Sequence, residues 1–132
     1  MFDKVESMEA WQQEEISKLE SKYGTVPPPW VIFPNQHPYS MCWSMGTGEA
    51  HVIIWSDWWE EQNYSEAEKI DYFRQWKPPV CWLEWMIDAV WEPAEDDEEE
   101  IANFAKVEAL GFGSKADFDR VMNDPKLFES EF

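Results

Sequence analysis

His37, Glu49, His51 and Asp57 are the residues whose side chains could do chemistry, because imidazole and carboxylate groups bind metals and transfer protons. A zinc or iron site needs two or three such ligands to converge. Glu49 and His51 are two positions apart, so on a helix they diverge by about 200°, whereas on a strand they share a face. A metal site of His37, Glu49 and His51 is therefore an alternative that requires a strand. A helix here predicts no metal and no cofactor.

Other catalytic patterns are weak in this chain. Gly46-Thr47-Gly48-Glu49 has two glycines of a phosphate-binding loop but lacks the Lys-Ser/Thr that follows them, and its acid would repel phosphate. We interpret it as a tight turn in which Thr47 or Gly48 caps the next helix. No serine or cysteine nucleophile lies in a recognisable motif with a base. The sequence therefore predicts a protein that is not an enzyme.

Charge is the second strong property of the sequence. The 132 residues contain 28 Asp and Glu against 10 Lys and Arg, which gives a net charge of −18 and a pI near 4.2. Such a surface repels nucleic-acid phosphates and anionic membranes and favours basic partners. We therefore expect a basic protein partner, with no direct binding to nucleic acid. Residues 30–56 are different, since their single formal charge is Glu49.

The chain shows no targeting or membrane signal. Residues 1–20 are acidic and have no apolar core of the kind a signal peptide needs. The longest apolar run falls far short of the roughly 20 residues that span a membrane. We expect a cytoplasmic protein that does not bind membranes.

The apolar periodicity predicts a mostly α fold: one compact domain, residues 1–132, of five to six helices. The elements expected are a helix at about 3–23, a Pro-rich extended segment at 25–40 whose residues 27–38 cross the core, a helix at about 48–61, a helical hairpin at about 65–91, an acidic linker at 92–100, and helices at about 99–110 and 115–122. Ser65 and Ser114 are expected N-caps, each in a capping box with the acid three residues later. Gly24 is the expected stop of the first helix.

Two of these assignments rest on finer patterns. Residues 51–55 are rich in β-branched side chains, so an α+β fold with a small hairpin of residues 30–33 and 51–55 is the alternative. A helix is favoured because it gathers Glu49, Ser56, Asp57 and Glu60 into one polar stripe. In the helix at 99–110, the expected apolar face consists of Ile101, Phe104, Ala105 and Leu110, and in the first helix it includes Trp11.

Ten tryptophans compete for the interior of a small protein, so we expect two or three of them to be partly exposed. Trp58, Trp82 and Trp85 are the candidates, because tryptophans close in the sequence, Trp58 beside Trp59 and Trp82 near Trp85, point in different directions on a helix, so that one tends toward the rim, where an indole could anchor a partner. Glu95 to Glu100 form a run of six acids that could attract a basic surface. The predicted partner-binding residues are Asp57, Trp58, Glu60, Glu61, Trp82, Trp85, Glu95, Asp96, Asp97 and Glu98.

Together these patterns predict a small acidic protein-binding module. The expected class is an inhibitor or antidote, such as an immunity protein or a phage or mobile-element inhibitor, whose negative surface imitates nucleic acid. The alternative is a small enzyme or a ligand- or metal-binding domain with a pocket in residues 30–56.

Overall fold

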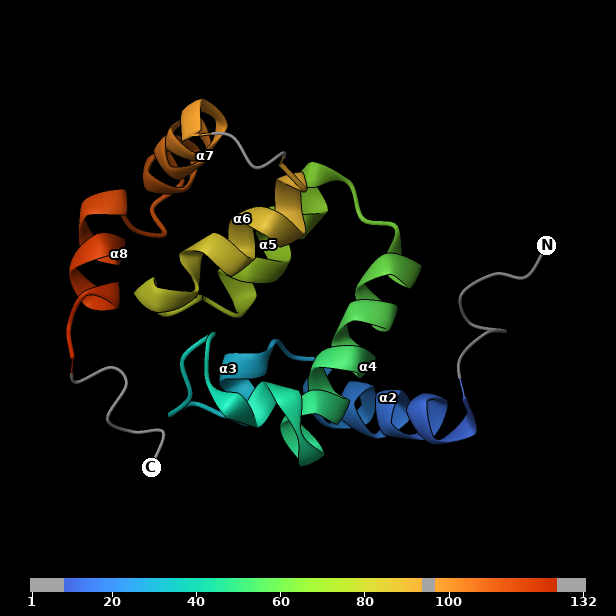
Figure 1. The fold of residues 1–132 in the computed structure, drawn as a ribbon. Coiled ribbons are helices and arrows are strands. Elements are labelled where there is room, and N and C mark those ends of the chain that lie inside the picture. Colours follow the sequence, from blue (N-terminus) through green and yellow to red (C-terminus); the bar gives the residue numbers. More distant parts are fainter. Residues whose placement is uncertain (1–8, 94–96, 126–132) are drawn as a thin grey trace. The chain divides into compact units, whose positions relative to one another are not determined.

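The structure, a computed structural model, describes residues 9–93 and 97–125. These residues form seven α-helices, two short 3-10 helices and no strand (Figure 1). In chain order they are α2 (Ala10–Tyr23), α3 (Pro29–Ile32), η1 (Met41–Ser44), α4 (Gly46–Gln62), α5 (Glu66–Gln75), η2 (Val80–Trp82), α6 (Leu83–Trp91), α7 (Asp97–Ala109) and α8 (Lys115–Met122). The predicted mostly α fold is confirmed. Among the helices described, none is long and apolar enough to cross a membrane.

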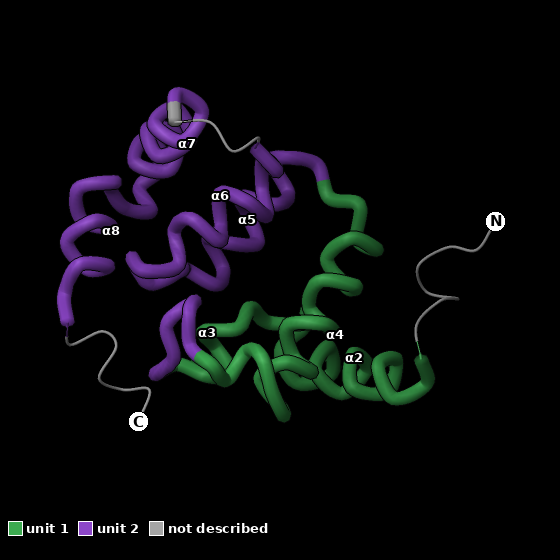
Figure 2. Tube along the Cα trace, in the orientation of Figure 1, with its two compact units in different colours: residues 1–34, 41–64 green, residues 35–40, 65–132 purple. Residues whose placement is uncertain are grey.

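The chain divides into two compact units, shown in different colours in Figure 2. Unit 1 comprises residues 1–34 and 41–64, and unit 2 comprises residues 35–40 and 65–132. Segment 35–40 therefore packs with unit 2, although both of its neighbours in the sequence belong to unit 1. The single domain expected for residues 1–132 stays a prediction.

In unit 1, α2 packs against α4 through a polar side chain as well as apolar ones. Gln12 is buried, and its Nε2 donates a 2.9 Å hydrogen bond to Oδ2 of Asp57 on α4. Trp11 was expected to face the core, but it is 43% exposed, and its indole donates to Glu9 instead. Gly24 ends the helix as predicted, in the left-handed conformation at φ 86°.

The Pro-rich segment was predicted to be extended over residues 27–38. This prediction is wrong for residues 29–32, which form the short helix α3. Pro29 occupies the first turn of the short helix α3, a position that suits its fixed φ and missing N–H group. Residues 26–30 are buried as a continuous stretch. The segment therefore fills part of the interior of unit 1, but residues 29–32 do so as one helical turn.

Helix α4 covers the segment whose secondary structure was ambiguous in the sequence. Its buried positions are Gly48, His51, Ile54, Trp55 and Trp58, which recur at steps of three and four residues. Glu49, Ser56 and Glu60 of the predicted polar stripe are exposed on the other side, whereas its fourth member, Asp57, is half-buried. The alternative α+β hairpin is wrong, because residues 51–55 lie within α4 and residues 29–32 form α3.

The glycines before α4 serve the backbone rather than a ligand. The helix begins at Gly46 with Met45 as its N-cap, so the capping role expected for Thr47 or Gly48 is wrong. Gly46 adopts φ 64°, and Gly48 allows η1 to approach α4 closely. A Cβ atom added at Gly48 would collide with the carbonyl oxygen of Cys42 and lie 2.7 Å from its carbonyl carbon.

Unit 2 is built on the predicted hairpin, in which α5 packs against α6 (Figure 1). Ser65 and Glu68 form the expected capping box at the start of α5. Pro78 and Pro79 separate the two helices, and η2 leads directly into α6. The α6 residues that are buried are Leu83, Met86, Ile87 and Val90, the apolar stripe of this helix.

Helices α7 and α8 complete unit 2. Because α7 begins at Asp97, the predicted acidic linker is already helical over residues 97–100. The expected apolar face of α7 is partly wrong: Phe104 is buried but Ile101 is 62% exposed, and Asn103 and Val107 point inward. Ala105 is exposed as well.

Helix α8 begins at the predicted N-cap, since the Ser114 hydroxyl accepts from the Asp117 amide. The Asp117 carboxylate contacts Arg120.

Replacement of Gly48 by alanine should destabilise unit 1, because the methyl group meets backbone rather than a side chain that could move aside. We expect a loss of about 1–3 kcal/mol in the free energy of unfolding, the range for overpacked sites. Thr47→Ala is the matched control, as Thr47 is the exposed neighbour on the same helical turn. Urea unfolding of both variants measures the effect, and equal stabilities would contradict the close approach.

Candidate functional site

The sequence-predicted metal ligands are not brought together. The imidazole of His51 is buried, and its Nε2 donates a 2.9 Å hydrogen bond to the Pro27 carbonyl oxygen. Glu49 is exposed on α4, so the two side chains diverge as a helix requires. His37 belongs to unit 2. Within the part of the chain that the structure describes, no three His, Cys, Asp or Glu residues could hold a metal ion.

His37 has a structural role in the loop that enters unit 2. It is 2% exposed, and its Nδ1 accepts a 3.1 Å hydrogen bond from the Tyr39 amide. An accepting Nδ1 is unprotonated, so a neutral His37 carries its proton on Nε2. The same loop is tied to η2, since the Trp82 indole donates to the Gln36 carbonyl oxygen at 3.3 Å.

Two of the three tryptophans expected at the surface are buried. Trp58 is 3% exposed and Trp82 is 2% exposed, so neither is among the partly exposed tryptophans that were expected. Trp58 meets Tyr64 edge-to-face within unit 1, with ring centroids 6.3 Å apart. Trp85 alone of the three is half-buried.

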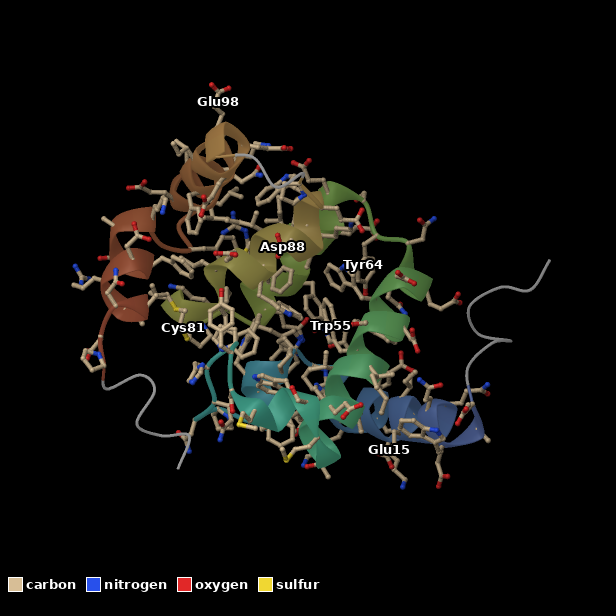
Figure 3. All side chains as sticks on the ribbon, viewed as in Figure 1. Glu15, Trp55, Tyr64, Cys81, Asp88 and Glu98 are labelled. Atoms are coloured by element: carbon tan, nitrogen blue, oxygen red, sulfur yellow. The ribbon has the colours of Figure 1, made fainter. Side chains whose placement is uncertain are left out.

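The predicted acidic contacts have different outcomes. Asp57 is bound by Gln12, and Glu61 lines a groove of about 280 Å³ between α2 and α4 in unit 1. Glu60 and Glu98 are exposed, and Glu98 projects from the start of α7 in Figure 3. Glu95 and Asp96 lie outside the described residues, as does the side chain of Asp97.

Trp85 leads to a cleft in unit 2 that we take as the candidate site. The cleft has a volume of about 160 Å³ and is lined by three kinds of residue. Aromatic walls come from Tyr39, Trp85 and Phe118, and acids come from Glu84 and Asp88. Pro38 and Cys81 complete the lining. Figure 3 labels two of these residues: Cys81 lies in η2, just before α6, and Asp88 lies on α6.

The walls of this cleft are positioned by packing. The Trp85 ring meets Phe73 of α5 and Trp82 of η2, at centroid distances of 6.3 and 5.8 Å, and both contacts are nearly perpendicular. Edge-to-face contacts of this kind favour one ring orientation. Tyr39 is 61% exposed on the loop that the Trp82 indole holds. The Trp85 indole is therefore fixed by its neighbours, while the Tyr39 phenol lies at the rim of the cleft.

The electrostatics of the cleft are dominated by two carboxylates one helical turn apart. Burial raises the pKa of Glu84, and the nearby charges of Asp88 and Glu100 raise it further, against an opposing effect of Lys115. Burial likewise raises the pKa of Tyr39, with Glu84 and Asp88 adding to the shift. Like charges at positions i and i+4 repel on a helix. The cleft is thus an electronegative site that a cation would stabilise.

The cleft also holds a thiol, and its two acids share one face of α6. Burial raises the pKa of the Cys81 thiol, whereas a reactive cysteine needs a thiolate. Glu84 and Asp88 project from the same side of one helix, so they do not flank a bond from opposite faces as a hydrolytic carboxylate pair does. The arrangement suits recognition of a cation.

Sequence reasoning identified Trp85 but missed Tyr39, Glu84 and Asp88. The signal was present as two acids four residues apart on either side of Trp85, a spacing at which like charges repel on a helix. Comparison of the chain with protein-family models, curated proteins and solved structures finds no match. The site therefore has to be interpreted from its own geometry.

Burial lowers the pKa of His51 below its ordinary 6.5, and the Pro27 hydrogen bond offsets part of this effect. Below pH 6.5 the unfolded chain binds a proton that folded His51 resists, so stability should fall as the pH is lowered. We expect wild type to lose stability relative to His51→Gln between about pH 7.5 and about pH 5.5. Urea unfolding across this range measures the difference, and parallel curves for the two proteins would contradict it.

The contribution of Glu84 to stability should depend on pH in the opposite direction to that of His51. The pKa of Glu84 in the folded state is raised above the ordinary 4.5, so at a pH just above 4.5 the folded state binds more protons than the unfolded state. Stability therefore falls as the pH rises from 4.5 through the folded pKa. Glu84→Gln should therefore raise the melting temperature near pH 7, with the gain shrinking below pH 4.5. Glu108→Gln, which removes one charge from an exposed site in the same unit, is the control. An equal gain in both variants would show only general charge relief.

Proposed function

We propose that this protein is a small non-enzymatic binding protein that engages a basic protein partner and acts as an inhibitor or antidote. The observation that carries the proposal is the surplus of acid. Ten basic side chains can neutralise at most ten of the 28 carboxylates, which leaves at least 18 without an internal counter-charge. An excess of this size makes approach to a basic surface favourable.

The placement of the basic side chains supports this proposal. In the described residues, Lys18 pairs with Glu14 and Glu15, Lys115 with Asp119, and Arg120 with Asp117, each within one helix. Lys22, Arg74 and Lys106 lie over aromatic rings. Exposed acids occur on other surfaces of both units; they include Glu49, Glu60, Glu66, Glu92, Glu98 and Glu108.

An inhibitory mode follows from the kind of partner that such a surface fits. One kind of basic face on a protein is a site for nucleic acid, where lysines and arginines contact phosphates. A protein of charge −18 that docks there excludes the nucleic acid by occupying the same site. This mode fits an immunity protein for a toxin, or a phage or mobile-element inhibitor of a nucleic-acid enzyme, acting in the cytoplasm. The proposed contacts are Glu60, Glu61, Trp85 and Glu98, with Asp57 at the edge of the α2–α4 pair.

Affinity capture from the native host at low salt, followed by reconstitution from purified components, tests the function. We expect a stoichiometric complex with a basic protein whose nucleic-acid binding the complex suppresses. The association rate should fall at least about tenfold between about 20 and 150 mM salt, because electrostatic steering is screened. A neutral or acidic partner, or an association rate indifferent to salt, would contradict the proposal.

Matched variants separate electrostatic steering of association from effects that any surface substitution could have. Changing Glu60 and Glu98 together to glutamine should slow association and leave dissociation nearly unchanged, as expected for charges at the rim of an interface. Ser56→Ala alters the exposed face of α4 without changing charge and should associate like wild type.

A further inference from the structure

We propose that the cleft formed by Tyr39, Glu84, Trp85 and Asp88 is a receptor for a single arginine side chain of the partner. This inference rests on the proposed function and specifies what one of its contacts recognises. It begins from the size of the site. A volume of about 160 Å³ is well below the roughly 300–1,000 Å³ of pockets for drug-sized ligands and cofactors, so the cleft suits one amino-acid side chain.

The charges of the cleft require that side chain to be cationic. Glu84 and Asp88 lie one turn apart on α6, which places their Cβ atoms about 5–6 Å from each other on the same helix face. Within the described residues, no hydrogen bond or ion pair reaches the Glu84 carboxylate. Lys115 acts on Glu84 only at longer range, because its ammonium pairs with Asp119 at 3.1 Å. An external cation would supply the missing counter-charge.

The aromatic walls favour arginine over lysine. A guanidinium group is planar, stacks on aromatic faces, and presents several N–H donors that can reach two carboxylates at once. Its weak hydration also makes entry into a half-buried cleft less costly than for an ammonium group. Trp85 is held in one orientation by Phe73 and Trp82, so the wall is formed before the ligand arrives. Tyr39, which also lines the cleft and is exposed, offers a second aromatic surface to the guanidinium group.

The test uses the full-length protein and blocked pentapeptides that carry one central arginine or one central lysine between glycines. Peptide is titrated into isotopically labelled protein, and the indole N–H signal of Trp85 is followed by NMR. We expect saturable shifts centred on Trp85 and Tyr39 with the arginine peptide, and at least about threefold weaker binding of the lysine peptide. Equal affinities, or shifts that are spread over the surface and do not saturate, would overturn the inference.

Variants identify the cleft as the site. Changing Glu84 and Asp88 to glutamine and asparagine should weaken arginine binding about tenfold or more, whereas Glu108→Gln with Asp71→Asn removes the same charge at exposed positions elsewhere and should change it less than twofold. Tyr39→Ala keeps the charge and replaces an exposed side chain, so it tests the stacking wall in a folded protein. We expect about two- to fivefold weaker binding from Tyr39→Ala. Equal losses from both acid pairs would show that only net charge matters.

The failure of this inference is distinguishable from failure of the proposed function. A partner that binds wild type and the Glu84/Asp88 variant equally well, with no arginine-peptide binding, would overturn the cleft and leave the function intact. Arginine-peptide binding at the cleft, with no basic partner found, would instead contradict the proposed function and leave the cleft as an arginine site.

Discussion

Aromatic and apolar packing has to stabilise each unit, because the ion pairs of this chain contribute too little to do so. The ion pairs quoted above join residues three or four apart on one helix and are largely exposed, so they contribute little to stability. The surplus negative charge meanwhile opposes compaction. Buried rings supply what is missing: Trp55 stacks on Trp59 in unit 1, and Phe104 packs against Phe118 in unit 2. Much of the tryptophan content thus serves packing within the units.

The sequence predicted best where a local rule determines the structure. A polar stripe at helical spacing identified α4 despite its β-branched residues, and Ser65 and Ser114 marked helix starts through their hydroxyl groups. It predicted less well where tertiary packing chooses among similar faces. In α7 the apolar residues are scattered among polar ones, so periodicity did not reveal that Asn103 is buried and Ile101 is exposed. In α2, Gln12 is buried because Asp57 on another helix accepts its hydrogen bond.

The candidate site was only partly visible in the sequence for a similar reason. Trp85 stood out by its residue type, but Trp58 and Trp82 were expected at the surface from the number of competing indoles, without knowledge of where the cores lie. Tyr39 lies in a proline-bounded loop with no periodicity, so nothing local connects it to α6. That connection depends on the hydrogen bond from the Trp82 indole to the Gln36 carbonyl oxygen, 46 positions away in the chain.

The assignment of residues 35–40 to unit 2 has a consequence for how the chain acquires its fold during synthesis. This segment leaves the ribosome well before Trp82, so it must wait for more than forty residues to follow before its native partner exists. Unit 1 can pack as soon as residue 64 has emerged, but the rim of the cleft is added only after α6 is available. A fragment cut between residues 64 and 65 would leave the Tyr39 loop on one piece and the acidic helix on the other. The cleft would then form only if the two pieces reassociated.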